Sequence, residues 1–393
     1  MTTTQRFTKS FRAAFDELHE SAERATGLSA FGDAAYRVPL AFLLDGYDRE
    51  SVLDEAGAEA TRGVLVRCLV GRLRSTHRLA LHPECLAQPL ERPLVIAGLP
   101  RTGSTALHKL LASDPGSQAL EHWLGCEPDV RPPRSEWPSH PGYQAAVAAL
   151  ERVYQGSPEM RAVHSMQAGE ADECRLLLMQ DFLNTSFSFN ATIPSYEAWV
   201  LEQDLRPAYA RYRDNLKLIG AREPEKRWVL KNSSHLWALP ALAATFPDVC
   251  LVQTHRNPLE WIVSVASLVH KSRVLYEPDV RKQEVGEQAL RQWARVVERC
   301  RADRKRLGCD VLDVHYRHFV GDPIGTIRRI YERFAWPWSP QAEKAIREWA
   351  EADRRGRHGV HRYRAEEYGL SEARIQERFA DYIEWEQAIL RSV

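Results

Sequence analysis

The chain has 393 residues, of which 44% are hydrophobic, so it can bury a substantial core and is not a disordered protein. Its 53 basic and 53 acidic residues cancel, which excludes a general electrostatic attraction to nucleic acid or to anionic membranes. An anion site in this protein would therefore have to be a local cluster of residues.

Targeting and redox signals are also absent from the sequence. The segment 1–27 carries charges throughout and lacks the apolar stretch of a signal peptide. The apolar run 261–269 is far shorter than the ~20 residues that span a bilayer. The seven cysteines are widely spaced and form no C-x-x-C pair, which favours reduced thiols over disulfides or zinc. We therefore expect a cytoplasmic protein with no membrane span and no bound metal.

Residues 1 to about 90 carry apolar side chains at helical spacing, as in Val64, Leu65, Cys68 and Leu69. This pattern predicts a helical N-terminal region without site chemistry of its own. From residue 91 to 393 we expect one α/β domain. A stretch at about 115–210 is helix-prone with proline-rich loops, and we interpret it as a helical insertion into that domain.

Short apolar runs alternate with helix-prone segments through this second region. The runs that predict strands are 93–97, 227–231, 249–254 and 311–316. Helices are predicted to follow the first, third and fourth of them. Strands that alternate with helices favour a parallel sheet wrapped by helices, which is the fold class we predict.

One loop between a predicted strand and its helix has the features of a phosphate site. It reads Gly98-Leu99-Pro100-Arg101-Thr102-Gly103-Ser104-Thr105. Such a turn points backbone N–H groups and the positive end of a helix at a bound anion. Its glycine spacing matches the P-loop of nucleoside triphosphatases, but Ser104 stands where that motif requires lysine. Because phosphoryl transfer normally uses that lysine with Mg²⁺, the loop favours a less charged group than a triphosphate.

With this loop the chain resembles the sulfotransferases, in particular a bacterial branch that shares G-x-P-R-[ST]-G-[ST]-[ST]. The family's donor is 3′-phosphoadenosine 5′-phosphosulfate (PAPS), used without a metal. The resemblance implies that the 5′-phosphosulfate is held by Arg101, Thr102, Gly103, Ser104 and Thr105.

Two later segments are similar to the family's site for the 3′-phosphate of the donor. Arg256-Asn257-Pro258-Leu259-Glu260 followed by Ser264 resembles R-[ND]-P-x-[DE]-x-x-x-S, which implies that Arg256 and Ser264 hold that phosphate. A looser match, Arg354-Arg355-Gly356, resembles the R-K-G segment that closes over the same group. The Asp-Trp pair that follows in the family is absent here, so a solvated basic loop is an open alternative.

Candidate catalytic residues come from two further segments. Lys231 ends a predicted strand, where sites of parallel sheets lie, and could stabilise the leaving group. The segment 230–235 resembles L-K-x-P-x-H and makes His235 a candidate general base. His164 and Asp172-Glu173-Cys174 resemble H-x(n)-P-E-E-C, so His164 and Glu173 are candidates as well, with a plain ion pair as the alternative for Glu173. Weaker carboxylate candidates are Glu121 and Glu127.

The resemblance implies an enzyme that moves a sulfuryl group in line from PAPS to an acceptor held in the helical insertion. The acceptor would be a hydroxyl or amine of a small molecule, glycan or lipid. Two alternatives stay open: a P-loop kinase of a small molecule, and a non-catalytic nucleotide-binding protein with a degenerate sulfotransferase fold. We expect no nucleic-acid partner, and a homo-oligomer is among the open assembly states.

Overall fold

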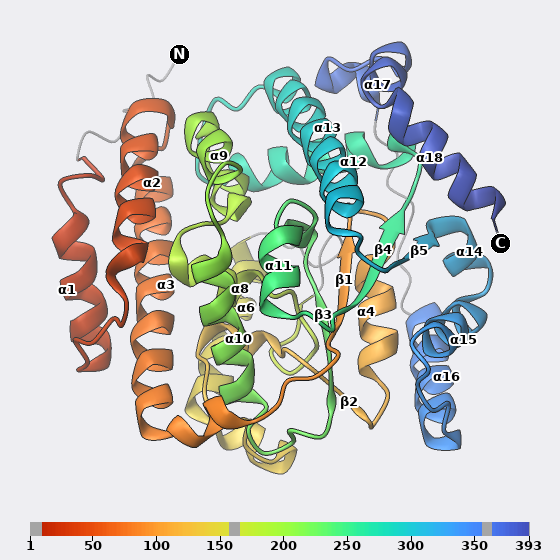
Figure 1. Cartoon of the computed structure of the whole chain (residues 1–393). Coiled ribbons are helices and arrows are strands. Elements are labelled where there is room, and N and C mark those ends of the chain that lie inside the picture. The colour runs from red at the N-terminus through yellow and green to blue at the C-terminus, as the bar shows by residue number, and fades with distance from the viewer. Residues whose placement is uncertain (1–9, 157–165, 356–363, 393) are drawn as a thin grey trace.

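The computed structural model describes residues 10–156, 166–355 and 364–392, without the side chains of 353–355. Its centre is a five-stranded, all-parallel sheet in the order β2-β3-β1-β4-β5 (Figure 1). The strands are β1 (Leu94–Gly98), β2 (Ser117–Ala119), β3 (Arg227–Lys231), β4 (Cys250–His255) and β5 (Val311–His315). The predicted parallel sheet flanked by helices is thus confirmed.

The sequence analysis missed β2. It has only three residues, Ser-Gln-Ala, and lies at the edge of the sheet against β3. Because neither an apolar run nor alternation marks so short and polar a strand, the pattern rules have nothing to detect. The four predicted strands agree with the observed bounds to within about a residue.

Helices cover both faces of the sheet, which explains why β1 is buried along its whole length. Leu94 and Ile96 face one layer, and Val95 and Ala97 face the other. The first layer contains α4 (Ser104–Ala112), α14 (Tyr316–Gly321), α15 (Pro323–Arg333) and α16 (Pro340–Arg355). The second contains α10 (Arg206–Ile219), α11 (Leu239–Thr245), α12 (Pro258–Arg273) and α13 (Lys282–Leu307) (Figure 1).

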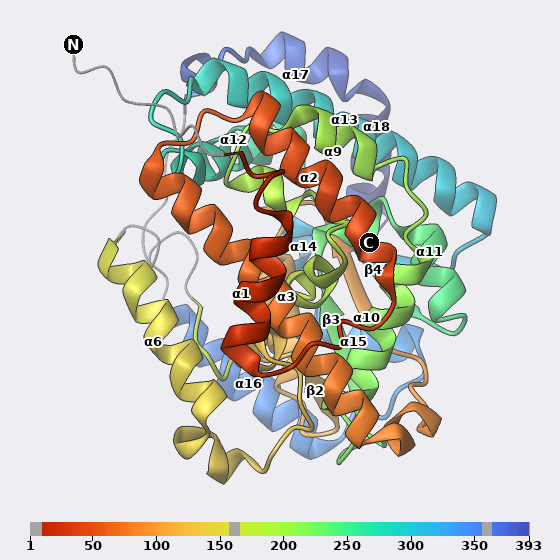
Figure 2. The same cartoon turned by 90° about the vertical axis from the view of Figure 1, so that its left-hand side faces the viewer.

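The N-terminal helices are α1 (Phe15–Thr26), α2 (Arg37–Glu50) and α3 (Glu55–Leu81). Figure 2 shows them on the side of the molecule that is turned away from α15 and α16. They share a separate hydrophobic cluster with residues 179–200, which include α9 (Pro194–Val200). Arg72 of α3 is buried and forms an ion pair with Asp181 at 2.7 Å. The N-terminal region is therefore packed against the predicted insertion.

The described part of the insertion also contains the helices α5 (His122–Cys126), α6 (Pro141–Gly156) and α8 (Arg175–Leu178). At the other end of the chain, α17 (Glu372–Arg378) packs against α12 and α13, and α18 (Ala380–Arg391) packs against β5. A buried hydrogen bond of 2.6 Å joins Glu386 of α18 to His315 of β5. Among the described residues, no helix is both long and apolar enough to cross a membrane.

Candidate active site

The loop that follows β1 is folded tightly against β4. Gly98 lies beside Thr254, and a Cβ at Gly98 would come within 1.8 Å of the Thr254 hydroxyl oxygen. The Thr102 hydroxyl donates to the Leu99 carbonyl at 2.5 Å and lies 2.6 Å from the Thr254 hydroxyl. Only glycine fits at position 98, and the hydrogen bonds of the buried Thr102 stabilise the tight conformation of the loop.

Two residues of this loop have left-handed backbone conformations. Arg101 has φ 65° and Gly103 has φ 82°. A non-glycine residue in this region costs free energy and is often found at functional sites. Directly after Gly103 the helix α4 begins, so its first-turn N–H groups, which lack partners within the helix, emerge at the loop. Ser104 is buried, whereas Arg101 and Thr105 are exposed. This geometry suits an anion.

Lys231 brings a buried cation to the same place. It ends β3 and pairs with Ile96 in the neighbouring β1, and its side chain is 2% exposed. The ammonium donates to the Thr105 hydroxyl at 3.0 Å and also to the Glu173 carboxylate. The phosphate loop and Glu173 are thereby joined through one lysine.

Glu173 is positioned by the backbone on both sides of it. The Cys174 N–H donates to the Lys231 carbonyl at 3.1 Å, and the Asp172 N–H donates to the Leu120 carbonyl at 2.7 Å. The side-chain amide of Asn232 contacts the second carboxylate oxygen of Glu173 at 3.4 Å. The segment that carries Glu173 is therefore fastened to the ends of β2 and β3.

A buried ion pair supports this segment. His122 Nδ1 lies 2.6 Å from an Asp172 carboxylate oxygen. Burial opposes charge on His122, but the hydrogen bonds with Asp172 and Cys126 outweigh it and raise its pKa to about 10. The same pairing overcomes the burial of Asp172 and keeps the pKa of its carboxyl below its usual range. At neutral pH this contact joins an imidazolium and a carboxylate.

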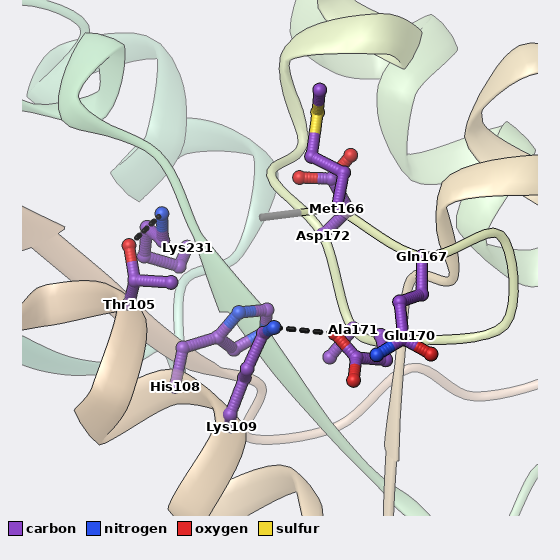
Figure 3. Close-up of a pocket in the computed structure, with 9 residues that line it drawn as sticks. All are labelled: Thr105, His108, Lys109, Met166, Gln167, Glu170, Ala171, Asp172 and Lys231. Atoms are coloured by element: carbon purple, nitrogen blue, oxygen red, sulfur yellow. Dashed lines mark hydrogen bonds and ion pairs between the residues drawn. The ribbon is translucent and has the colours of Figure 1, made fainter. Parts of the chain in front are cut away.

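Figure 3 shows a pocket between α4, the segment 166–172 and Lys231. An ion pair of 2.5 Å between Lys109 and Glu170 closes one side, and the Thr105–Lys231 hydrogen bond lies on another. The His108 ring lies between these two pairs (Figure 3). The pocket is thus polar and directly adjoins the phosphate loop.

Arg256 connects a second segment to this loop. It follows β4, and its guanidinium donates to the Arg101 carbonyl at 2.9 Å and to Glu260 at 2.9 Å. It also lies 4.1 Å from the centre of the Tyr316 ring. Ser264 is half-buried on α12, the helix that begins directly after this segment. The two sequence-predicted anion segments therefore meet through Arg256.

His235 is placed elsewhere. Asn232 caps the short helical turn 233–236, which directs the His235 ring into the core, where it is 0% exposed. Its Nδ1 lies 2.6 Å from the Tyr209 hydroxyl, and burial lowers its pKa to about 3. His235 does not line the pocket. A role as the base stays a prediction that this placement does not favour.

The two weaker carboxylate candidates each form an ion pair with an arginine. Glu121 pairs with the buried Arg131 at 3.1 Å, and Glu127 pairs with Arg74. Four other predicted residues cannot be placed: His164 and Gly356 lie outside the described residues, as do the side chains of Arg354 and Arg355.

The sequence analysis also overlooked pocket residues. His108 and Lys109 follow Thr105 by three and four residues, which puts them on the same side of α4 as the loop hydroxyls. That helical spacing was the available signal. Glu170 and His122 carried no signal of their own, because their partners are distant in sequence.

Comparisons with known proteins identify the family of the chain. A model of the sulfotransferase family matches residues 93–340. The solved structure of sulfotransferase STF1 from Mycobacterium tuberculosis H37Rv is 38% identical, and the match covers 95% of this chain and 100% of that one with a TM-score of 0.87. Sulfotransferase STF9 from Mycobacterium avium is 27% identical over 94% of this chain and 96% of its own, with a TM-score of 0.85. A search of curated proteins found no match. By the family match and the likeness to STF1, this chain belongs to the sulfotransferase family.

Proposed function

We propose that this protein transfers the sulfuryl group of PAPS to a hydroxyl or amine of a small-molecule acceptor. The observation that carries the proposal is the contact of buried Lys231 with both Thr105 of the phosphate loop and the Glu173 carboxylate. One cation thus links a group suited to hold the donor with a group suited to take a proton.

The donor's 5′-phosphosulfate would lie against the N–H groups and hydroxyls at the start of α4, with Arg101 beside it. Arg256 and Ser264 would hold the 3′-phosphate. Arg256 is suited to this because its guanidinium is already bonded to the loop carbonyl of Arg101, which couples the two anion segments.

In the transfer step, the acceptor oxygen or nitrogen attacks sulfur and the bond from sulfur to the bridging phosphate oxygen breaks. The leaving phosphate oxygen gains negative charge, which Lys231 stabilises from a water-poor position. The acceptor loses its proton to Glu173. Binding of the donor phosphate draws Lys231 toward it, which weakens the Lys231–Glu173 ion pair and makes the carboxylate a better base.

The kinase alternative finds less support. Ser104 occupies the position of the P-loop lysine, and the described residues contain no group of three or more side chains suited to hold a metal ion. The carboxylate of Asp313 on β5, which a kinase could use as a magnesium ligand, forms an ion pair with Arg304 and a hydrogen bond with His255.

Calorimetric titration tests the donor class without an acceptor. Adenosine 3′,5′-bisphosphate should bind, AMP should bind much more weakly, and ATP with Mg²⁺ should not be preferred. Preference for ATP with Mg²⁺ would instead support the kinase. Sulfuryl transfer from radiolabelled PAPS to a panel of alcohols, phenols and amines then separates an enzyme from a degenerate nucleotide-binding protein.

A further inference from the structure

His108 is a buried histidine in the wall of the pocket. It lies on α4 three residues after Thr105, about 4.5 Å further along the helix axis and on nearly the same face. His108 as a whole residue is only 1% exposed. A small molecule that reaches Thr105 and Lys231 could therefore contact His108 with the neighbouring part of its framework.

The hydrogen bonds of His108 define its tautomer. Nε2 lies 3.0 Å from the Val229 carbonyl oxygen. A carbonyl can only accept, so Nε2 carries the proton and a neutral His108 presents a bare lone pair at Nδ1. Burial, together with the charge of Lys231, lowers the pKa of His108 to about 4, so the ring is neutral at physiological pH.

This lone pair has no hydrogen-bond partner within the described residues. Other buried side-chain atoms also lack one, but His108 is the single such residue of the described chain that lines the pocket. A buried acceptor without a partner is unfavourable, and the pocket is the place from which a ligand could supply the missing hydrogen.

The surroundings select the kind of group that fits. Lys231 and Lys109 place two ammonium groups on the pocket wall, and both are already paired with carboxylates. A neutral hydroxyl can donate to Nδ1 without adding a third positive charge. In the proposed reaction, however, the single proton of an attacking hydroxyl goes to Glu173. For a hydroxyl acceptor, the hydrogen bonded to His108 must therefore belong to a second group of the same molecule.

We propose that Nδ1 of His108 anchors a second hydroxyl of the sulfuryl acceptor, so that the acceptor is a vicinal diol in which one hydroxyl reacts and its neighbour is held. This inference rests on the proposed function and narrows its substrate class. His108 acts here as a positioning residue, since it binds the group beside the one that reacts.

The test uses matched pairs of probes titrated into the full chain saturated with adenosine 3′,5′-bisphosphate. Catechol is compared with phenol, and 1,2-cyclohexanediol with cyclohexanol, so that aromatic and aliphatic diols are distinguished. At least one diol should bind about tenfold more tightly than its mono-hydroxy partner. In His108→Phe, which keeps a ring but has no lone pair, the preference should fall to within about twofold.

His235→Phe is the matched control, because it makes the same change at a buried histidine that does not line the pocket. It should keep the diol preference. The inference is overturned if neither diol binds better than its partner, or if the preference survives in His108→Phe.

If His108→Phe does not fold, titration of the wild-type protein with 2-methoxyphenol still tests the inference. This compound keeps the second oxygen of catechol but lacks the hydrogen on it. It must bind like phenol, and binding like catechol would overturn the inference. Failure of the bisphosphate to bind would count against the proposed donor site instead. The diol pairs would then be titrated into the nucleotide-free protein to decide the role of His108.

Discussion

The two sides of the candidate site are built in different ways. On the donor side, the phosphate loop, Lys231 and Arg256 extend directly from the ends of β1, β3 and β4, in the middle of the sheet. On the acceptor side, the segment 166–173 is an irregular stretch held by two ion pairs, Lys109–Glu170 and His122–Asp172. The donor side thus takes its rigidity from the pairing of the central strands, whereas the acceptor side is held by isolated backbone hydrogen bonds together with ion pairs that depend on side-chain charge.

Because of this difference, donor-side and acceptor-side substitutions should be distinguishable by two measurements, nucleotide binding and turnover. Donor-side changes should alter nucleotide binding, and acceptor-side changes should alter turnover while binding is preserved. Lys231, which contacts both sides, should be the exception.

Lys231→Met should have the largest effect. It removes the buried cation that the proposed transfer uses, and a fall in kcat of about 10³-fold is expected. The measurement is the turnover of radiolabelled PAPS with the first acceptor that the panel identifies. Turnover near the wild-type rate would remove Lys231 from the mechanism and break the link between the two sides.

Glu173→Gln should lower kcat by about 10²- to 10³-fold, because glutamine cannot accept the proton. Calorimetry should show adenosine 3′,5′-bisphosphate binding close to that of the wild type. His235→Phe is the comparison, with expected turnover per folded molecule near wild type. If instead His235→Phe were inactive and Glu173→Gln active, the general base would be His235.

Arg256→Ala should weaken adenosine 3′,5′-bisphosphate binding by about 10- to 100-fold, through loss of a charge-assisted contact. The melting temperature should stay near that of the wild type, since the guanidinium is partly exposed and its carboxylate partner Glu260 also pairs with Arg317. AMP, which lacks the 3′-phosphate, should bind both proteins equally. An equal loss of AMP affinity would mean that Arg256 shapes the loop and does not read the 3′-phosphate.

The last prediction concerns the stability of the fold and its dependence on pH. The pKa of His122 is about 10 in the folded chain and about 6.5 when unfolded, so its ion pair contributes stability in full below pH ~6.5. That contribution should decline as the pH rises toward 10, because the folded state then holds the extra proton less and less favourably. Urea unfolding at pH 7 and pH 10 should show a steeper loss for the wild type than for His122→Gln. Parallel losses in the two proteins would show that the acceptor-side ion pair does not stabilise the fold.

The donor side could be predicted from sequence because its signals are local. The apolar run of β1, the glycines of the loop and the positions of Lys231 and Arg256 at strand ends are all visible within a few residues. The parallel sheet that joins them is confirmed, although their roles stay predictions. β2 was missed because a strand of three residues, Ser-Gln-Ala, is too short to show a periodicity.

The acceptor side could not be predicted in the same way. Glu173 was marked as a candidate, but its contact with Lys231 joins residues 58 positions apart, and no spacing rule covers such a pair. His235 illustrates the opposite failure. A histidine after a strand end suggested the site, but the Asn232 cap turns the chain and places the ring against Tyr209 in the core.

The order of the strands also affects how this protein folds. The central strand β1 finds its two neighbours late in the chain, since Leu94 pairs with Val229 and with Cys250. Non-local pairing of this kind slows folding, because the entropy of closing a long loop is lost before the contacts that compensate for it can form. During synthesis more than a hundred residues follow β1 before β3, the first strand that pairs with it, emerges from the ribosome. The phosphate loop, although its residues are close together in sequence, is therefore expected to gain its shape only after β3 and β4 have been synthesised.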